Sequence, residues 1–594
     1  MGVPSYFSYI IKNYPQIMIR NLSNIHNFFL DCNSIIYDVV NSNHFINFFN
    51  EIDNKQNISN QHYNFFYTDA NNKIDNYIIN ATIEKIKTLI NLINPSSTIF
   101  ITFDGIPPVA KLEQQRNRRF KSNYQQSIIN AINNTEITKW NTSSITPGTP
   151  FMKLLDERCS KVFNNPIFFN VNNIIYSGTN IYGEGEHKIF NYLRSNKEYL
   201  CNQTNVIYGL DADLIMLSIN CLPFIPNIYL YRETPEFIKS INIDLEPNEN
   251  YILNIPELSH QIINTIKPNI FKDINTLNNI NTLEHNYLFK YNSYLNDYIF
   301  LCFLLGNDFL PHFPALNIRT GGIDKLLTAY NETGFDGFLI ENQTINWNNF
   351  YKLIEFLANN EEQFIIKEHN LRNKKECYKL IEYSNEDKIK NFNNLPKYER
   401  TIEHYINPYK KYWNKRYYKA LIPNNLDKNN NKHIKSICIN YLEALEWTFK
   451  YYNYGCVDWR WCYQYNYPPL LSDLLKYIPS VNSVNNDINY INYINNFNDV
   501  NKNNFEFFNV NKLSKKSLEP IDNFTQLCYV LPRQSLHLLP PNLYKALIQY
   551  KSYHYVTDCE FSWAYCSYFW ECHPNLPIID INELEQFVEK YNNL

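Results

Sequence analysis

The sequence predicts an α/β fold, in which a mixed, mostly parallel central sheet is flanked by helices and a C-terminal region packs against it. From residue 1 to about 335, short apolar runs alternate with longer segments that mix polar and apolar residues. This is the pattern of strands separated by helices. Three of the apolar runs are followed by an acidic residue, as expected at the edge of a parallel sheet where ligands bind.

The chain divides into three parts by the same patterns. The clearest strand predictions are Asn27–Leu30, Thr98–Phe103 and Asn205–Leu210. The predicted units are a first domain at 1–335, a helical connector at 336–395 and a second organised region at 396–594. We expect the second region to complete the site of the first domain. An Asn-rich stretch at 480–517 predicts a flexible loop inside it.

Composition and charge limit the class of protein. The 594 residues are 44% hydrophobic and 19% charged, which is ordinary for a soluble globular protein. A net charge of −4 gives no overall basic footprint, although an acidic metal site combined with local basic patches would also produce it. Thirteen scattered cysteines, and the lack of a signal peptide or a membrane-length apolar segment, predict reduced thiols in an aqueous compartment.

Acidic residues gather at strand ends and in short glycine-containing motifs. Asp31, Asp104, Asp211 and Asp213 follow the three predicted strands, and the carboxyl ends of parallel strands meet at one edge of a sheet. Further acids are Glu184 and Glu186 in YGEGEHKIF, at a predicted helix start, and Asp308 in FLLGNDFLP. Any one of these residues could simply cap the helix that follows it. Seven in five compact motifs favour a common site.

Such a cluster predicts bound divalent cations. Carboxylates packed at one edge would repel one another without counter-ions. Ligands that are all oxygen favour Mg²⁺ or Mn²⁺ over zinc. Two ions about 4 Å apart can activate a water molecule and stabilise the leaving oxygen in phosphodiester hydrolysis. We therefore expect two metal ions.

Basic residues follow the second strand on one helix face. Lys111, Gln115, Arg118 and Arg119 occur at i, i+4, i+7 and i+8 after a helix start at Pro107–Pro108. These side chains suit a terminal phosphate, because Arg can donate two N–H groups to it at once. A solvated surface face is the alternative. A second basic and aromatic stretch, 408–420, predicts either a nucleic-acid channel or a surface helix with inward tyrosines.

These motifs together resemble the Xrn family of 5′→3′ exoribonucleases over nearly the whole chain. The matching segments, in family order, are MGVPSYFSYIIKNYPQI, FLDCNSII, FDGIPPVAKLEQQRNRRF, ITPGTPFM, SGTNIYGEGEHKI, YGLDADLIML, FLLGNDFLPH, LEALEWTFKYYNYGCVDWRWCYQYNYPPLLSDL and FTQLCYVLP. The resemblance implies a core like that of PIN domains and 5′ nucleases. It also implies processive, two-metal hydrolysis of single-stranded RNA with a 5′ monophosphate to mononucleotides.

The resemblance assigns roles to residues already identified. The seven acids match the family's metal ligands, and Lys111, Gln115, Arg118 and Arg119 match its pocket for a 5′ monophosphate. Trp570, seven residues before Pro577, matches an aromatic residue that stacks on the leading bases. Tyr37 stands where the family has a histidine, so it can stack on a base but carries no positive charge near neutral pH.

Two other functions compete with this interpretation. A flap-type DNA nuclease would place a glycine-rich hairpin after the last acid, where this chain has no glycine until Gly321. An inactive RNA-binding protein of the same fold would lack metal ligands, and all seven are present. We expect a monomer without an obligate protein partner or membrane association. We expect it in the cytoplasm, with the nucleus or a virion as alternatives, and the composition is compatible with an A/T-rich protist or a large DNA virus.

Overall fold

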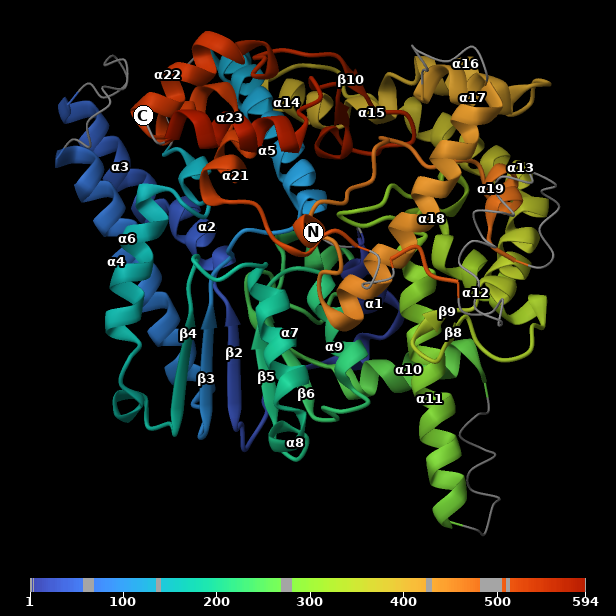
Figure 1. The fold of residues 1–594 in the computed structure, drawn as a ribbon, viewed down its shortest axis with the longest axis horizontal. Helices are drawn as coiled ribbons and strands as arrows, with labels where there is room; N and C mark the ends of the chain where they lie inside the picture. Colours follow the sequence, from blue (N-terminus) through green and yellow to red (C-terminus); the bar gives the residue numbers. More distant parts are fainter. Residues whose placement is uncertain are drawn as a thin grey trace.

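The computed structural model describes residues 3, 5–56, 69–134, 140–268, 280–422, 430–480, 505–508 and 513–592. Its centre is a seven-stranded sheet in the order β1-β7-β6-β5-β2-β3-β4 (Figure 1). The strands are β1 (Met18–Ile19), β2 (Asn27–Asp31), β3 (Thr98–Thr102), β4 (Asn173–Ser177), β5 (Asn205–Tyr208), β6 (Ile228–Glu233) and β7 (Asn250–Asn254). Strands β2 to β6 pair in parallel, whereas β7 is antiparallel to β6 and β1 is antiparallel to β7. The predicted mixed, mostly parallel sheet is therefore confirmed.

Helices cover both faces of the sheet, so its central strands are apolar on both sides. Successive side chains of a strand point to opposite faces. Phe28 and Leu30 accordingly pack with α2 (Asn33–Asn41), α4 (Asp69–Ile93) and α6 (Pro150–Val162). The intervening Phe29 packs on the other face, where the covering helices are α7 (Gly185–Ser195), α9 (Asp213–Cys221), α10 (Ile255–Ile266) and α11 (Ile280–Phe303).

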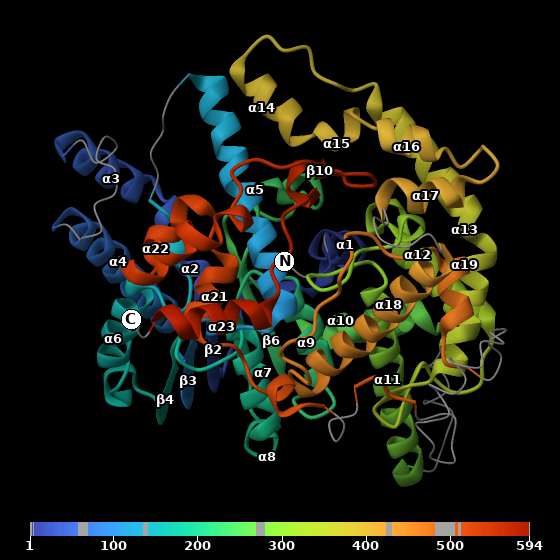
Figure 2. The ribbon, with the colours of Figure 1, turned by 45° about the horizontal axis from the view of Figure 1, so that its top comes forward.

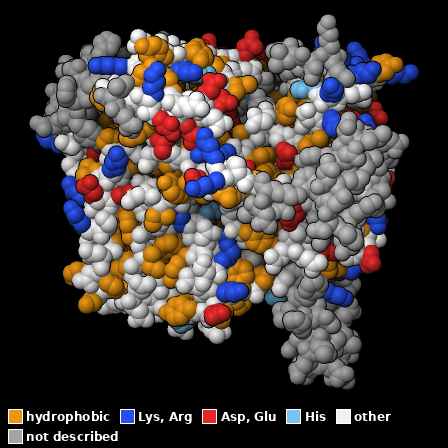
Figure 3. All heavy atoms as spheres, in the orientation of Figure 1, with side chains coloured by type: hydrophobic (Ala, Val, Ile, Leu, Met, Phe, Trp, Pro, Cys, Tyr) orange, Lys and Arg blue, Asp and Glu red, His pale blue; other side chains and the backbone are white. Residues whose placement is uncertain are grey.

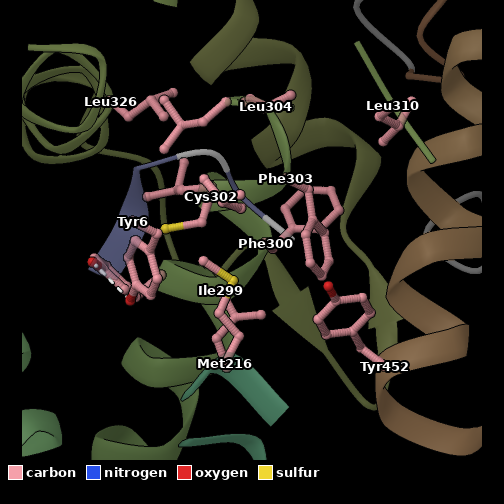
Figure 4. Packing of buried hydrophobic residues seen from close by; sticks show 14 of the residues in the cluster. Tyr6, Met216, Ile299, Phe300, Cys302, Phe303, Leu304, Leu310, Leu326 and Tyr452 are labelled. Atoms are coloured by element: carbon pink, nitrogen blue, oxygen red, sulfur yellow. Dashed lines mark hydrogen bonds between the residues drawn. The ribbon is translucent and has the colours of Figure 1, made fainter. Parts of the chain in front are cut away.

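The hydrophobic core that contains Phe29 continues into the later part of the chain. Trp347 of α13 (Trp347–Glu376) and Trp447 of α18 (Asn430–Tyr454) belong to the same buried cluster as Phe29. Figure 4 shows Tyr452 of α18 packed beside Phe303 in this cluster, with ring centroids 5.0 Å apart. The domain boundaries at 335 and 395 stay predictions. Most of the predicted flexible loop at 480–517 lies outside the described residues.

A third cluster joins one long helix of the first domain to the end of the chain. Leu112 of α5 (Val109–Asn133) packs with α21 (Asn523–Val530), α22 (Pro541–Tyr550) and α23 (Ile581–Asn592). The guanidinium of Arg116 donates to the carbonyl oxygen of Pro577 at 2.8 Å, which fixes α5 to this region. Figure 2 shows α5 rising past these helices, away from the sheet. The C-terminal region packs against the first domain, as predicted.

Two further expectations concern the whole chain. All thirteen cysteines are free thiols, and most of them are buried. Among the described residues, we find no helix with both the length and the apolar character that crossing a bilayer requires.

Candidate active site

The ends of three neighbouring strands bring four of the predicted acids together. β2 ends at Asp31, Asp104 follows β3, Asp211 lies in the loop after β5, and Asp213 is the first residue of α9. In the sheet, β3 and β4 lie on one side of β2, whereas β5 and β6 lie on the other side. The strand order therefore reverses between β2 and β5, which makes this boundary a topological switch point. Ligands of α/β sheets bind at such points, beyond the carboxyl ends of the strands.

Asp104 is held by a residue that no sequence motif indicated. The side-chain amide of Asn33 donates to Asp104 Oδ2 at 2.6 Å, and its oxygen accepts from the Asp104 backbone N–H at 3.1 Å. The other oxygen, Asp104 Oδ1, accepts from the Gly185 N–H at 2.7 Å. Asn33 is the first residue of α2, directly after β2, so this exchange locks the ends of β2 and β3 together.

The predicted helix start at Glu184 and Glu186 is confirmed, because α7 begins at Gly185. Both glutamates are buried, at 5% exposure. Gly185 lies against the other acids, since a β-carbon there would stand 2.6 Å from Asp31 Oδ1 and 3.4 Å from Asp104 Oδ1. Only glycine lets the backbone of α7 approach the strand ends this closely.

The acids are close enough to perturb one another's ionisation. Burial, together with repulsion from Asp104 and Asp211, raises the pKa of Asp31 well above its ordinary value. Burial and the carboxylate of Asp213 likewise raise the pKa of Glu186, and burial raises the pKa of Asp213 to about 6. Seven carboxyl groups, three of them buried, interact at this site, which is costly unless cations accompany them.

One such cation belongs to the chain itself. Lys111 Nζ lies 2.5 Å from Glu184 Oε2 and 2.7 Å from Asp308 Oδ2. Although burial alone would raise it, the pKa of Asp308 is lowered by the Lys111 ammonium. Lys111, predicted as a phosphate-binding residue, therefore lies inside the acidic cluster, where it bridges two of the predicted metal ligands.

The rest of the predicted basic face continues along α5 from Lys111. Gln115 is buried, and its Oε1 has no hydrogen-bond partner. Arg119 Nη1 is also buried without a partner, whereas Arg118 is exposed. Unpartnered buried polar atoms on adjacent turns are uncommon and indicate a site for a polar ligand.

Tyr37 and Trp570 both lie beside this face. Burial lowers the pKa of Arg119 to about 10, and the neighbouring Tyr37 opposes that shift. Trp570 is 42% exposed, and its carbonyl oxygen accepts from Lys121 Nζ of α5 at 2.6 Å. Its ring is nearly parallel to that of Tyr568, with an interplanar angle of 10°. The two predicted stacking residues thus both lie near the helix that carries the basic face.

Helix α18 supplies two buried tyrosines that the sequence motifs did not reveal. The Tyr451 hydroxyl donates to Glu184 Oε1 at 2.8 Å, and the Tyr452 hydroxyl donates to Asp213 Oδ1 at 2.5 Å. The Tyr451 ring stacks between Trp447, at 4.8 Å, and His187, at 3.8 Å between centroids. The second region therefore orients acids of the first domain directly.

The donor set fits hard divalent cations. Ligand atoms of Glu184, Glu186 and His187 lie within 4.8 Å of one another. Two buried carboxylate oxygens, Asp31 Oδ1 and Glu186 Oε2, have no hydrogen-bond partner. Oxygen atoms that are aimed into a site and left unpaired are the ligands that Mg²⁺ and Mn²⁺ prefer.

Comparisons with known proteins place the chain in one family. The family model described as "XRN 5'-3' exonuclease N-terminus" matches residues 1–234, and the one described as "Xrn1 helical domain" matches 288–404 and 381–485. The chain is 26% identical to the "5'-3' exoribonuclease 2 homolog" of Drosophila melanogaster over 80% of its own length and 61% of the relative's.

Two further relatives are longer still. The "5'-3' exoribonuclease 1" of Homo sapiens is 26% identical over 100% of this chain and 34% of its own length. The protein of the same name from Saccharomyces cerevisiae is 30% identical over 60% of this chain and 23% of its own length. The chain thus spans less than two thirds of these relatives. The two family models together match more than half of the sequence, and the chain belongs to the Xrn family of 5′-3′ exonucleases.

Proposed function

We propose that the protein is a 5′→3′ exoribonuclease that hydrolyses single-stranded RNA with a 5′ monophosphate, one nucleotide at a time. The observation that carries this proposal is the juxtaposition of the seven-carboxylate cluster, three of whose members are buried, with the cationic face of α5. The names of the relatives, which are 5′-3′ exoribonucleases, support it.

The acidic cluster would hold two Mg²⁺ or Mn²⁺ ions. The predicted ligands are Asp31, Asp104, Glu184, Glu186, Asp211, Asp213 and Asp308. When bound, the ions lower the pKa of a water molecule and stabilise negative charge on the leaving oxygen. The chain's own residues fix this geometry: Asn33 orients Asp104, and the two tyrosines of α18 orient Glu184 and Asp213.

The face of α5 would receive the terminal phosphate. The unpartnered Nη1 of Arg119 and the exposed guanidinium of Arg118 can donate to phosphate oxygens, with Gln115 beside them. Tyr37 and Trp570, which lie near this helix, would stack on the leading bases. We propose that the site accepts a monophosphate and excludes a triphosphate or a cap by size.

The proposal is tested by offering matched single strands to the purified protein, with and without Mg²⁺. The substrates are RNA with a 5′ monophosphate, the same RNA with a 5′ triphosphate, and DNA of the same sequence with a 5′ monophosphate. We expect Mg²⁺-dependent loss of the first, releasing mononucleotides from the 5′ end. Equal attack on all three would contradict the phosphate pocket, and no Mg²⁺-dependent cleavage of any would contradict the nuclease assignment.

Removing the hydroxyl groups of α18 should weaken metal binding without unfolding the protein. Tyr451→Phe and Tyr452→Phe keep the buried rings but release Glu184 and Asp213 from their donors. Loss of such an orienting partner typically lowers metal affinity about 10- to 100-fold. Mn²⁺ binding, measured by calorimetry or by electron paramagnetic resonance, gives this readout without RNA.

A matched control for these variants lies on the same helix. Tyr441 is also fully buried, but its hydroxyl donates to the backbone oxygen of Pro311 and not to a carboxylate. Tyr441→Phe should therefore leave Mn²⁺ affinity unchanged. Equal loss of affinity in all three variants would show that α18 acts only through general packing.

Location and assembly are part of the same proposal. The thirteen free thiols support a reducing compartment, and we propose the cytoplasm. We propose that the chain acts as a monomer on RNA, since the site is built from elements of a single chain.

A further inference from the structure

We propose that the loop between α16 and α17 is a second RNA-binding surface, which holds the strand downstream of the active site. α16 spans Thr401–Ile406 and α17 spans Trp413–Leu421, so the loop is 407–412. This inference rests on the proposed function, because it assumes an RNA substrate whose 5′ end occupies the acidic cluster.

The first observation is the chemistry of the loop surface. Tyr409 and Tyr412 are 61% and 67% exposed, and the lysines between them, Lys410 and Lys411, are exposed as well. From residue 404 to 420 the chain carries five Lys or Arg residues and no acid. Figure 3 shows basic and hydrophobic side chains together at this edge of the molecule. Exposed aromatic rings between cations are what a single-stranded polyanion with flat bases requires.

The second observation is that the loop is held rigidly in a costly conformation. The guanidinium of Arg416 in α17 donates to the carbonyl oxygens of five preceding residues, at distances of 2.8 to 3.2 Å. These residues are Tyr405, Ile406, Asn407, Lys410 and Lys411. Tyr412 has a φ of +64°, a left-handed conformation that is rare for a bulky aromatic residue. Strain of this kind persists where the surroundings impose it, and it is common at binding sites.

Neighbouring groups on α13 anchor the loop without neutralising it. The Tyr409 hydroxyl and the Asn370 side chain are hydrogen-bonded, at 2.7 and 2.9 Å, which fixes the tyrosine ring by its edge. Two acids lie at the margins, and each already has a partner. Glu362 accepts from the Trp413 indole at 3.1 Å, and Glu376 is paired with Arg400. The lysines of the loop therefore remain available to phosphates.

The third observation is the position of the loop relative to α5. Figures 1 and 2 both place α14 (Asn385–Asn393), α15 (Leu395–Tyr398) and α16 in a row between the outer part of α5 and α17. In this row, the Lys397 ammonium of α15 lies 3.8 Å from the centre of the Tyr568 ring. The Tyr568 ring is in turn stacked with the ring of Trp570. A basic side chain of α15 thus contacts the aromatic pair that contains the proposed base-stacking residue.

The test measures binding against RNA length. Fluorescent 5′-monophosphorylated oligouridines of increasing length are titrated with the full chain in EDTA, which prevents cleavage. For the wild type, we expect affinity to rise with length once the strand reaches the loop. For Lys410→Glu/Lys411→Glu, this gain in affinity with length should disappear. The plot of log affinity against log salt should also become less steep, by about 0.7 for each phosphate that the protein no longer neutralises. For Tyr409→Ala/Tyr412→Ala, long RNA should bind about tenfold more weakly for each stacked base.

A matched control lies at the opposite end of the molecule (Figure 1). Helix α8 (Lys197–Leu200) exposes Lys197 and Tyr199, so Lys197→Glu/Tyr199→Ala makes similar changes far from the loop and should retain the wild-type length dependence. Melting temperatures of all variants check folding. If both loop variants keep the wild-type length dependence, the inference is overturned and the surface is left for a protein partner. Failure of the proposed function would appear differently, as a lack of Mg²⁺-dependent degradation of the same RNA by the unmodified chain.

Discussion

Asp211→Ala should abolish RNA cleavage and leave RNA binding intact. Asp211 is exposed within the cluster, and it raises the pKa of both Asp31 and Glu186 by repulsion. Removing it deletes a proposed metal ligand, for which we expect a loss in kcat of about a thousandfold, or about 4 kcal/mol.

Cleavage and binding are measured separately. Single-turnover cleavage with Mg²⁺ reports the first, and RNA affinity measured in EDTA reports the second. RNA binding should survive, since the phosphate-binding face and the stacking residues are intact. Glu198→Ala, on α8 at the opposite end of the sheet, removes an exposed acid and should change neither quantity. An Asp211→Ala protein that cleaves RNA at the wild-type rate would contradict the proposed role of this carboxylate.

Gly185→Ala should inactivate the protein through a single methyl group. The added carbon would stand 2.6 Å from Asp31 Oδ1 and 3.0 Å from Thr102 Oγ1, so the acids and the start of α7 would have to separate. Overpacking of this kind costs about 1 to 3 kcal/mol of stability. A displacement of about 1 Å in catalytic groups can cost about 100-fold in rate. We therefore expect the rate to fall by about two orders of magnitude in a protein that still folds.

Gly183→Ala separates backbone strain from crowding. Gly183 has a φ of +96°, and a β-carbon there would meet nothing within 4 Å. This variant should lose stability, about 1 kcal/mol, because alanine resists that conformation. The spacing of the acids should be preserved in Gly183→Ala, so its Mn²⁺ affinity should stay closer to that of the wild type than the affinity of Gly185→Ala does. If Gly185→Ala retained full activity, the spacing of the acids at the start of α7 would not be critical.

Sequence patterns predicted most of the site because its acids follow strands. A short apolar run that ends in an acid specifies both a strand and the edge at which the acid lies, and β2, β3 and β5 formed as expected. Helical periodicity also separated Arg116 from the basic face of α5. In the structure Arg116 turns away and binds the carbonyl oxygen of Pro577. The spacing of residues along a helix is enough to predict which side chains share a face, even when their distant contacts are unknown.

The residues that the sequence did not indicate act through contacts that no local pattern encodes. Tyr451 and Tyr452 meet their carboxylates across more than two hundred residues of sequence, in a chain that contains 48 tyrosines. Asn33 similarly does not stand out in an asparagine-rich sequence. Lys111 was assigned to the phosphate site from the face it shares with Arg118, and only the structure shows that it bridges Glu184 and Asp308.

The stacking of α18 against the start of α7 has a consequence for synthesis of the protein. All seven acids have been translated by residue 308, whereas the hydroxyl groups that orient two of them arrive only with residues 451 and 452. A nascent chain that is still attached to the ribosome therefore carries the carboxylates without their alignment. The acids Glu184 and Asp213 are therefore fully oriented only in a chain that already includes α18.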